Sequence, residues 1–419
     1  MAVKIVRQPN KIALLGAPTS AAALSAGHEG APAALRSAGL IERLRSIGYD
    51  VTDLGDDPRQ LYKPDDESPR ARNVPAVIAA LEALKPRVEQ AVKSAALPLI
   101  LSGDCSVALA TVAGARRYFR RVSLIYMDRD ADLNTPATTP SGSVDGMVVS
   151  HLIGRGAAEL VRFWGEPPLV REPDLALFGI ERLDPSEEEV LRNSTLRSFH
   201  ADEIKRKGAA ATAQTAVDRI HAGASEFVLH LDVDVIAGFS ATNYPGSGGL
   251  TLEDVREALN VFAQQKNLAA LEITAYNPTK DPDGAAAAKI VDLIAGALEK
   301  RLETLKSAAA EAAVSAKPGP AVAPPKPAEP SAEAAPEPEP IPEARPGESW
   351  SSDTLEEPAA DQNQAEAPEE KESPVHASVA PAVDFPSEPP QPFEPSSTPG
   401  DDPAPSSDGS GDDSGEPTA

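Results

Sequence analysis

The sequence predicts an α/β fold, a three-layer α/β/α arrangement built around a mostly parallel sheet. Short apolar runs alternate with longer amphipathic stretches as far as about residue 310. Strands that alternate with helices form βαβ units, which place helices on both faces of a parallel sheet. Aspartates are clustered directly after two of the apolar runs. Because ligands of such sheets bind beyond the carboxyl ends of the strands, these clusters are candidate functional residues.

The apolar runs give the predicted strands in chain order. They are KIALLGA (11–17), YDVTDLG, LPLILSG (97–103), VSLIYMD, DLALFGI, RSFH, FVLHLDV and ALEITAY. Amphipathic periodicity predicts the helices between them. These cover 32–47, 74–96, 106–118, 186–193, 210–222, 252–265 and 284–307. Pro32 suits the first turn of the first helix, since its fixed φ matches the helical value.

Charge and proline content divide the chain into a domain at 1–308 and a tail at 309–419. The formal net charge is −25, and residues 317–419 hold 23 acidic side chains, 4 basic side chains and 24 of the 42 prolines. Such a segment buries too little apolar surface to offset the entropy of ordering it. We therefore expect an acidic, Pro/Glu/Ser-rich disordered tail. Its PEPEPIPEARP stretch favours polyproline II, which could dock on a protein partner.

Several functional classes are disfavoured by composition. No run approaches the roughly 18 apolar residues of a membrane span, and the N-terminus lacks the apolar core of a signal peptide. No basic stripe indicates nucleic-acid binding. Cys105 is the only cysteine in the chain, which excludes an intrachain disulfide. We expect a cytoplasmic protein without nucleic-acid or membrane partners.

The two aspartate clusters predict a metal site. Asp128, Asp130 and Asp132 alternate in YMDRDADLN, and Asp232 and Asp234 alternate in FVLHLDVDV. Alternate residues of an extended strand point the same way, so each cluster aims its carboxylates at one place. Crowded carboxylates repel unless a cation or a proton intervenes. Carboxylates favour Mn²⁺, Mg²⁺ or Ca²⁺, and a pair of ions can activate water for hydrolysis. The alternative is that the aspartates only cap turns and helices.

Several ordered segments resemble the ureohydrolase family, which comprises arginase, agmatinase and formiminoglutamase. The family segments G-G-D-H-S, D-A-H-x-D and S-x-D-x-D are matched by SGDCS (102–106), DRDAD (128–132) and LDVDV (231–235), and HEGAP, NTPATTPSG (134–142) and EITAYNP (272–278) also look like family segments. The resemblance spans about residues 10–305. It implies an arginase-like fold, two Mn²⁺ ions, a small amidine or amide substrate, and a homo-oligomer, either a trimer or a hexamer.

The resemblance assigns roles by position. Asp132 takes part in proton transfer, and Asp145 stands where arginases have a proton-shuttling histidine. Asn134, Thr139 and Ser141 match contacts to the substrate carboxylate, and Asp184 matches a residue near the substrate amine. The positions of the metal ligands are Cys105, Asp128, Asp130, Asp132, Asp232 and Asp234.

Three positions depart from the family pattern. Cys105 and Asp130 replace the two histidine ligands, which gives the site more negative charge than two divalent ions balance. Three possibilities follow, namely Mn²⁺, Zn²⁺, which is a better match for a thiolate, or no bound metal. Ala275 replaces the glutamate that pairs with the guanidinium group. Glu272 lies on the same strand and is expected to face the other side. His230 alternates with Asp232 and either faces the site or packs in the core.

Two functional hypotheses follow. The first, which we favour, is a non-catalytic descendant with weak or lost guanidino hydrolysis, whose scaffold and tail serve binding or regulation. The second is an active metal-dependent hydrolase of a linear amidine or amide C–N bond. The three departures favour the first hypothesis, and the four retained family aspartates favour the second.

Overall fold

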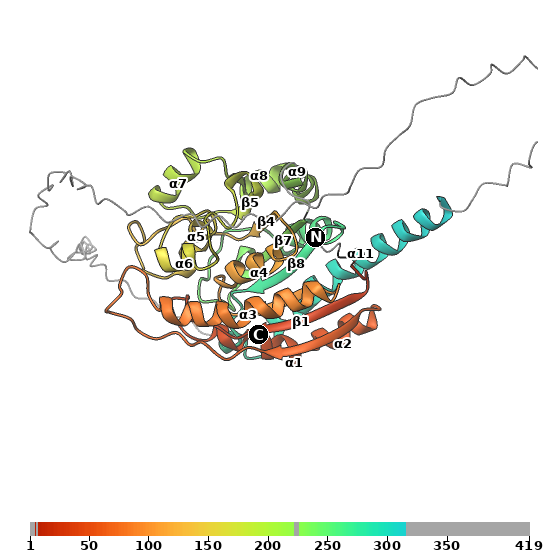
Figure 1. Cartoon of the computed structure of the whole chain (residues 1–419), viewed down its shortest axis with the longest axis horizontal. Helices are drawn as coiled ribbons and strands as arrows, with labels where there is room; N and C mark the ends of the chain where they lie inside the picture. Colours follow the sequence, from red (N-terminus) through yellow and green to blue (C-terminus); the bar gives the residue numbers. More distant parts are fainter. Residues whose placement is uncertain (1–4, 6, 222–225, 316–419) are drawn as a thin grey trace, which may run out of the picture. The chain divides into compact units, whose positions relative to one another are not determined.

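The protein is described by a computed structural model that covers residues 5, 7–221 and 226–315. Its centre is a parallel sheet of eight strands in the order β2-β1-β3-β8-β7-β4-β5-β6 (Figure 1). The strands are β1 (Lys11–Ala17), β2 (Asp50–Asp56), β3 (Leu97–Ser102), β4 (Val122–Met127), β5 (Leu175–Ile180), β6 (Arg197–His200), β7 (Glu226–Asp232) and β8 (Leu268–Thr274). All eight strands were predicted from the apolar runs.

Helices cover both faces of the sheet, which confirms the three-layer α/β/α prediction. One hydrophobic core joins the sheet to α1, α2, α8, α9, α10 and α11, and the other joins it to α3, α4, α5 and α6. The helices are α1 (Ala31–Ser37), α2 (Leu40–Ser46), α3 (Val74–Lys93), α4 (Val107–Arg116), α5 (Val148–Leu152), α6 (Ala158–Arg162), α7 (Pro185–Arg192), α8 (Ala201–Lys207), α9 (Ala209–His221), α10 (Leu252–Ala263) and α11 (Ala285–Ser315).

Residues of β1 show how the strands divide between the two cores. Ile12 and Leu14 pack in the first core, and Leu15 packs in the second. Because successive side chains of a strand point to opposite faces, a strand buried on both sides has no polar alternation. This is why the predicted strands read as continuous apolar runs.

The structure differs from the sequence prediction in the helices. The single helix expected over 32–47 is two helices, because Gly39 between them adopts a φ of 85° that a continuing helix does not allow. Three short helices, α5, α6 and α8, were not predicted. Each has only five to seven residues, which is too few for a periodic pattern to emerge.

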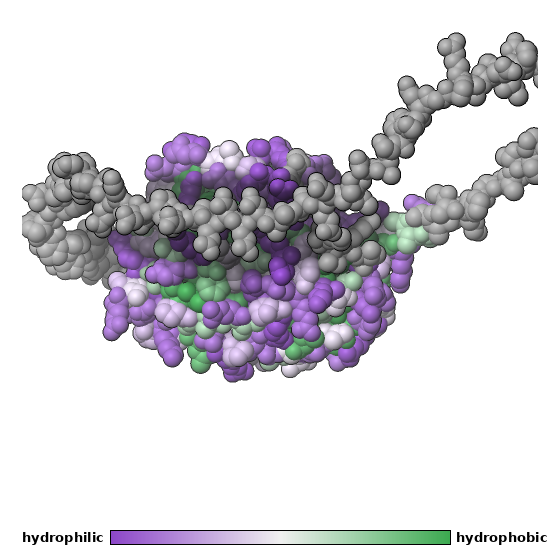
Figure 2. Space-filling view, in the orientation of Figure 1, coloured by the Kyte–Doolittle hydropathy of each residue, from purple (hydrophilic) through white to green (hydrophobic). Residues whose placement is uncertain are grey.

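The last helix passes the predicted domain boundary. α11 continues through Ser315, beyond residue 308, and the boundary itself stays a prediction. Residues 309–315 of the predicted tail therefore belong to α11, and residues 316–419 lie outside the described residues. Within the described part of the chain, no helix combines the length and apolar character needed to cross a membrane. The face of the folded part seen in Figure 2 is mainly hydrophilic, with smaller hydrophobic areas.

Burial on both faces of the sheet gives the first testable prediction. Leu14→Ala and Leu15→Ala should each lower the free energy of unfolding by about 2–5 kcal/mol, because each side chain is fully buried in a different core. Leu61→Ala is the matched control, since Leu61 is 44% exposed and should change stability by about 0.5 kcal/mol or less. Chemical denaturation measures all three. A mild effect at one of the two core positions would contradict a sheet covered on both faces.

Candidate functional site

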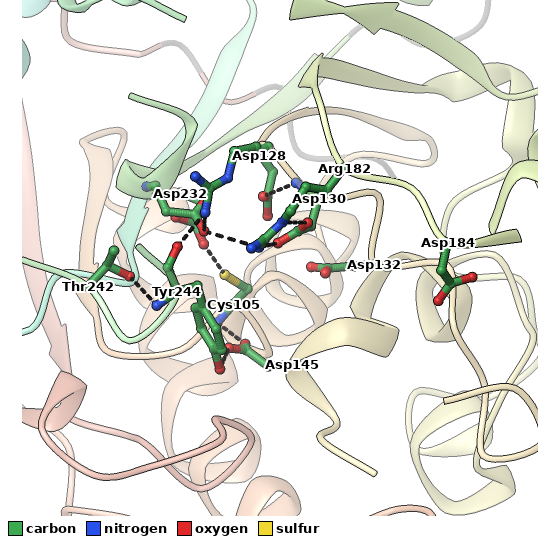
Figure 3. A network of polar contacts seen from close by, with 12 residues as sticks. Cys105, Asp128, Asp130, Asp132, Asp145, Arg182, Asp184, Asp232, Thr242 and Tyr244 are labelled. Atoms are coloured by element: carbon green, nitrogen blue, oxygen red, sulfur yellow. Dashed lines mark hydrogen bonds and ion pairs between the residues drawn. The ribbon is translucent and has the colours of Figure 1, made fainter. Parts of the chain in front are cut away.

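Chain topology brings the predicted ligands together at the carboxyl ends of the central strands. β7 pairs with β4, and Met127 is aligned with Leu231, so Asp128 and Asp232 leave adjacent strands at the same level. Cys105 follows β3, and its Sγ lies 3.1 Å from Asp232 Oδ2. Figure 3 shows these side chains pointing toward one another. The sequence-based expectation that the clusters converge is therefore met by the geometry.

These residues line a cavity of about 660 Å³ at that edge of the sheet. The predicted site residues that line it are Cys105, Asp128, Asp130, Asp132, Asn134, Ser141, Asp145, Asp184, Asp232 and Asp234. Thr139 is buried and is not among the lining residues. Its Oγ1 instead accepts hydrogen bonds from the backbone N–H groups of Ser141 and Gly142, which fixes the turn that carries Ser141.

Two arginines that the sequence analysis did not consider lie among the carboxylates. Arg129 is 1% exposed, and its Nη2 lies 3.2 Å from Asp234 Oδ2 and also donates to the Tyr244 carbonyl. Arg182 pairs with both oxygens of Asp130, with Nε 2.7 Å from Oδ1, and approaches Asp234 Oδ2 at 3.9 Å. Figure 3 shows Arg182 directly beside Asp130. Asp130 and Asp234 therefore already have positive partners.

Three aspartates at the centre of the site have no such partner. Within the described part of the chain, Asp128, Asp132 and Asp232 form no ion pair with an arginine, lysine or histidine. Burial raises the pKa of each of these three carboxyls well above its usual range, and the neighbouring carboxylates raise it further. Both effects penalise the charged form, so this part of the site favours a proton or a cation.

Backbone N–H groups hold the two D-x-D segments in place. The amide of Asp130 donates to Asp128 Oδ1, and the amide of Asp234 donates to Asp232 Oδ1, each at 2.7 Å. This is the turn-forming behaviour expected of a strand-end aspartate. It uses only one oxygen of each carboxylate, so the turn interpretation accounts for part of the cluster only.

Asp145 organises the thiol side of the cavity. Its Oδ1 accepts the Cys105 backbone N–H at 2.8 Å, and its Oδ2 accepts the Tyr244 hydroxyl at 2.7 Å. Burial, followed by the nearby charge of Asp104, raises the pKa of Asp145 to about 7. Burial and the charge of Asp232 raise the pKa of the Cys105 thiol well above its usual value. In this state Cys105 is a neutral donor to Asp232.

A buried aromatic pair, formed by Tyr126 and His230, lies next to Asp132. The Tyr126 hydroxyl donates to Asp132 Oδ2 at 2.5 Å, and its ring stacks on His230 with a centroid distance of 4.1 Å. His230 Nδ1 lies 2.8 Å from Glu272 Oε1. His230 is thus packed and hydrogen-bonded, and a ring nitrogen also comes within 4.8 Å of ligand atoms of Cys105 and Asp128. The sequence left open whether His230 packs in the core or faces the site, and each of the two possibilities describes part of its environment.

The residues matched to substrate contacts are engaged with one another. Asn134 Nδ2 donates to Asp184 Oδ2 at 2.8 Å. Asp184 also caps α7, where its Oδ1 accepts the N–H groups of Ser186 and Glu187. Figure 3 shows Asp184 apart from the central carboxylates. The structure therefore gives Asp184 a capping role, and a substrate role stays a prediction.

The strand that carries a guanidinium-binding glutamate in the family pattern presents no carboxylate to this cavity. Ala275 is fully buried at a φ of 64°, and its N–H donates to the Gly103 carbonyl. Glu272 is also fully buried, pairs with His230, and is absent from the residues that line the cavity. It is therefore not available to replace the missing glutamate.

Comparison with known proteins agrees with the motifs. A family model described as the arginase family matches residues 10–298. The chain belongs to the arginase family. The arginase of Bacillus caldovelox is 30% identical over 300 residues, which cover 70% of this chain and 99% of that protein. The arginase of Bacillus subtilis is 30% identical over 298 residues, which cover 70% of this chain and 98% of that protein.

Solved structures of family members share the fold. The native B. caldovelox arginase superposes with a TM-score of 0.64 at 29% identity, covering 69% of this chain and 98% of that chain. Formimidoylglutamase from B. subtilis gives 0.57 at 20% identity, covering 71% and 88%, which supports the fold alone. The chain is thus a divergent arginase-family protein, as the sequence motifs predicted.

A pair of divalent ions, which the family resemblance implies, does not fit the donor set of this arginase-family chain. Ligand atoms of Asp128, Asp232 and Asp234 come within 4.8 Å of one another, and so do those of Cys105, Asp128 and His230. The first group borders two guanidinium groups that already occupy Asp130 and Asp234. A second cation there would meet positive charge, so we derive no reaction step from a two-ion centre.

Arg129 could have been found from the sequence. The family segment D-A-H-x-D has alanine where DRDAD has arginine, so the substitution is visible beside the histidine replacement. Arg182 stands in ERLDP, and only the tertiary structure shows that it reaches across to Asp130.

The buried arginine gives the second prediction. Arg129→Met should lower the free energy of unfolding by about 3–5 kcal/mol, because Asp234 would remain buried without its partner. Arg182→Met should cost about 1 kcal/mol or less, since the Arg182 side chain is 45% exposed. Denaturation in the presence of a chelator measures both. Asp234→Asn in the Arg129→Met background should recover part of the loss, and equal effects of the two arginine variants would contradict the assignment.

Proposed function

We propose that this arginase-family protein has lost the hydrolysis of guanidino substrates and keeps the fold and its acidic cavity for binding or regulation. The observation that carries the proposal is the pair of guanidinium groups, from Arg129 and Arg182, already bound to carboxylates of the site. A site whose aspartates pair internally has fewer carboxylates left for ions or substrate. The absence of a carboxylate at Ala275 supports the same conclusion, because losing one partner of a charged contact costs about 2–5 kcal/mol.

The cavity itself suits a small cationic ligand. Its lining contains many acidic side chains and, among the residues described, only Arg182 as a cationic one. Such a surface attracts cations, because the low-dielectric walls of a cavity focus the electric field of its carboxylates. The presence of this acidic cavity supports the binding of such a ligand as its role.

A second candidate is an active metal-dependent hydrolase of a linear amidine or amide C–N bond. It is supported by Asp128, Asp132 and Asp232, which line the cavity and form no ion pair with any residue that the structure describes. In this alternative a less cationic substrate takes the place of arginine, because Ala275 cannot pair with a guanidinium group.

The family resemblance supplies further parts of the proposal. These are Mn²⁺ as the ion of the ancestral site and a homo-oligomer such as a trimer or hexamer. A cytoplasmic location is proposed as well, because a chain with a single cysteine suits a reducing compartment. A protein partner for the acidic tail belongs with them, since the regulatory hypothesis assigns binding to the tail as well as to the cavity.

Urea formation tests the loss of hydrolysis. The wild-type chain, incubated with Mn²⁺ and either arginine or agmatine, should form no urea above the rate without protein. Cys105→His, Asp130→His and Ala275→Glu together should remain inactive, because Arg129 still holds Asp234. Adding Arg129→Ala and Arg182→Ala to these three changes should produce urea.

The control replaces an arginine outside the site. In the same triple background, Arg206→Ala is made in place of Arg129→Ala and Arg182→Ala. Arg206 is an exposed residue of α8, so this variant should stay inactive. Urea formation by the wild-type chain would overturn the proposal, because it would show that the hydrolysis of a guanidino substrate persists. Activity in the triple variant alone would show that the arginines do not block the site.

A further inference from the structure

A second cavity, of about 580 Å³, lies at the amino ends of the central strands. Its lining includes Arg7, which precedes β1, Leu97, the first residue of β3, and Lys266, which precedes β8. Arg301 and Leu305 of α11 form another part of the wall. Because the strands are parallel, this cavity and the acidic cavity stand at opposite edges of the sheet. None of the described residues lines both cavities.

The charge of this second cavity is opposite to that of the acidic cavity. Arg7, Lys266 and Arg301 line it, and no acidic side chain among the described residues does so. Glu226 pairs with Arg7 Nη2 at 2.6 Å without being a lining residue. Lys266 and Arg301 form no ion pair within the described ranges of the chain. The cavity therefore keeps an excess of positive charge.

Arg301 has hydrogen-bond donors that the fold does not use. Its Nη1 donates to the carbonyls of Ala263 and Gln265 at 2.7 and 2.6 Å, which caps the end of α10. A guanidinium group has five N–H donors on three nitrogens. Nε and Nη2 of Arg301 form no hydrogen bond with any residue that the structure describes. The capping role accounts for one nitrogen, and the other two are left for a molecule in the cavity.

The position of Arg301 makes an unused donor edge costly. The residue is only 3% exposed, and burial lowers the pKa of its guanidinium group to about 10, with the charge of Arg7 acting in the same direction. Arg301 is still charged at neutral pH. A buried charge without a full set of partners is unfavourable, so an anion beside Arg301 would supply the missing contacts.

The unused edge of Arg301 fits a carboxylate. Arg36 shows the arrangement elsewhere in this chain, where Nε and Nη2 each lie 2.9 Å from one oxygen of Asp53. Such bidentate pairs are stronger than single hydrogen bonds between neutral groups. One buried guanidinium group balances one negative charge. A doubly charged phosphate would therefore keep part of its charge buried without a partner.

Much of the remaining wall is aliphatic. Ile5, Leu97, Leu305 and Ala308 line the cavity, and no aromatic side chain does so among the residues described. An aliphatic chain gains hydrophobic free energy with each methylene group that enters such a space. The volume falls within the range of about 300–1,000 Å³ that is usual for small-molecule sites.

We propose that this cavity binds a small aliphatic carboxylate. Its carboxylate group lies on Nε and Nη2 of Arg301, near Lys266, and its chain packs against Leu97 and Leu305. The inference goes beyond the proposed function, because none of these residues belongs to the acidic cavity. It gives the protein a second ligand, of opposite charge to the first.

Isothermal titration calorimetry of the full chain with octanoate tests the class of ligand. Octanoate should bind at one site per chain. Octanol should bind about tenfold or more weakly, because it cannot pair with a buried charge. Acetate should also bind about tenfold or more weakly, because it lacks the aliphatic chain. Absence of octanoate binding, or an equal affinity for octanol or acetate, would overturn the inference.

Octyl phosphate separates the two kinds of anion in the same measurement. It should bind more weakly than octanoate, because its second charge finds no buried partner. An affinity equal to or higher than that of octanoate would refute the assignment of a carboxylate. Urea formation by the protein would refute the proposed function and leave all of these affinities unchanged.

Substitutions in the lining test the location of the ligand. Arg301→Lys keeps the charge and should weaken octanoate binding about tenfold or more, because a lysine lacks the planar fork of donors. Leu305→Glu places a carboxylate in the cavity and should abolish binding. Lys306→Gln is the matched control, since Lys306 is an exposed residue of α11 outside the lining, and should leave the affinity unchanged.

The two lining variants differ in their effect on the fold. Arg301→Lys changes a cap of α10, whereas Leu305 is half-buried and forms no cap, so Leu305→Glu should fold even where the other variant does not. Circular dichroism and the denaturation midpoint check both. An octanoate affinity that is unchanged in folded Leu305→Glu would place the ligand elsewhere and overturn the site.

Discussion

Burial of several aspartates at one end of a parallel sheet is the constraint on which this site depends. β3, β4 and β7 all end at the same edge of the sheet, so the side chains that follow them converge whatever their chemistry. Carboxylates in that position raise one another's pKa and carry a desolvation cost. The fold therefore requires protons or positive partners there. In this chain, arginine side chains supply part of the positive charge.

The layers of the fold could be predicted from sequence because they depend on local patterns. A strand buried on both sides is a continuous apolar run, as in β3 and β4, and an amphipathic helix shows its period over several turns. The break at Gly39 was not predicted, because a glycine within a periodic stretch is compatible with a continuous helix until its φ is known. The short helix α8 follows β6 directly and has no independent pattern.

The site was predictable to the level of which residues meet. Motif spacing identified Cys105 and the five aspartates, and all of them line one cavity. Arg129 stands inside the DRDAD motif and was visible there, whereas the other partners of those residues were not predictable, because they are tertiary contacts between distant segments. Arg182 reaches Asp130 across 52 positions of sequence, and Tyr244 reaches Asp145 across 99. A sequence motif specifies donor types, whereas their charge balance depends on side chains from elsewhere.

A counter-charge that belongs to the chain differs from a bound ion in one further respect. Stabilisation by a ligand follows its free concentration, so a protein that relies on ions weakens as they become scarce. The guanidinium group of Arg129 is covalently attached, and its contact with Asp234 is fully buried. That contact survives dilution and competition for metals inside a cell. Evolution along this line would replace a cation that must be taken up from the surroundings by an arginine side chain that is made as part of the protein.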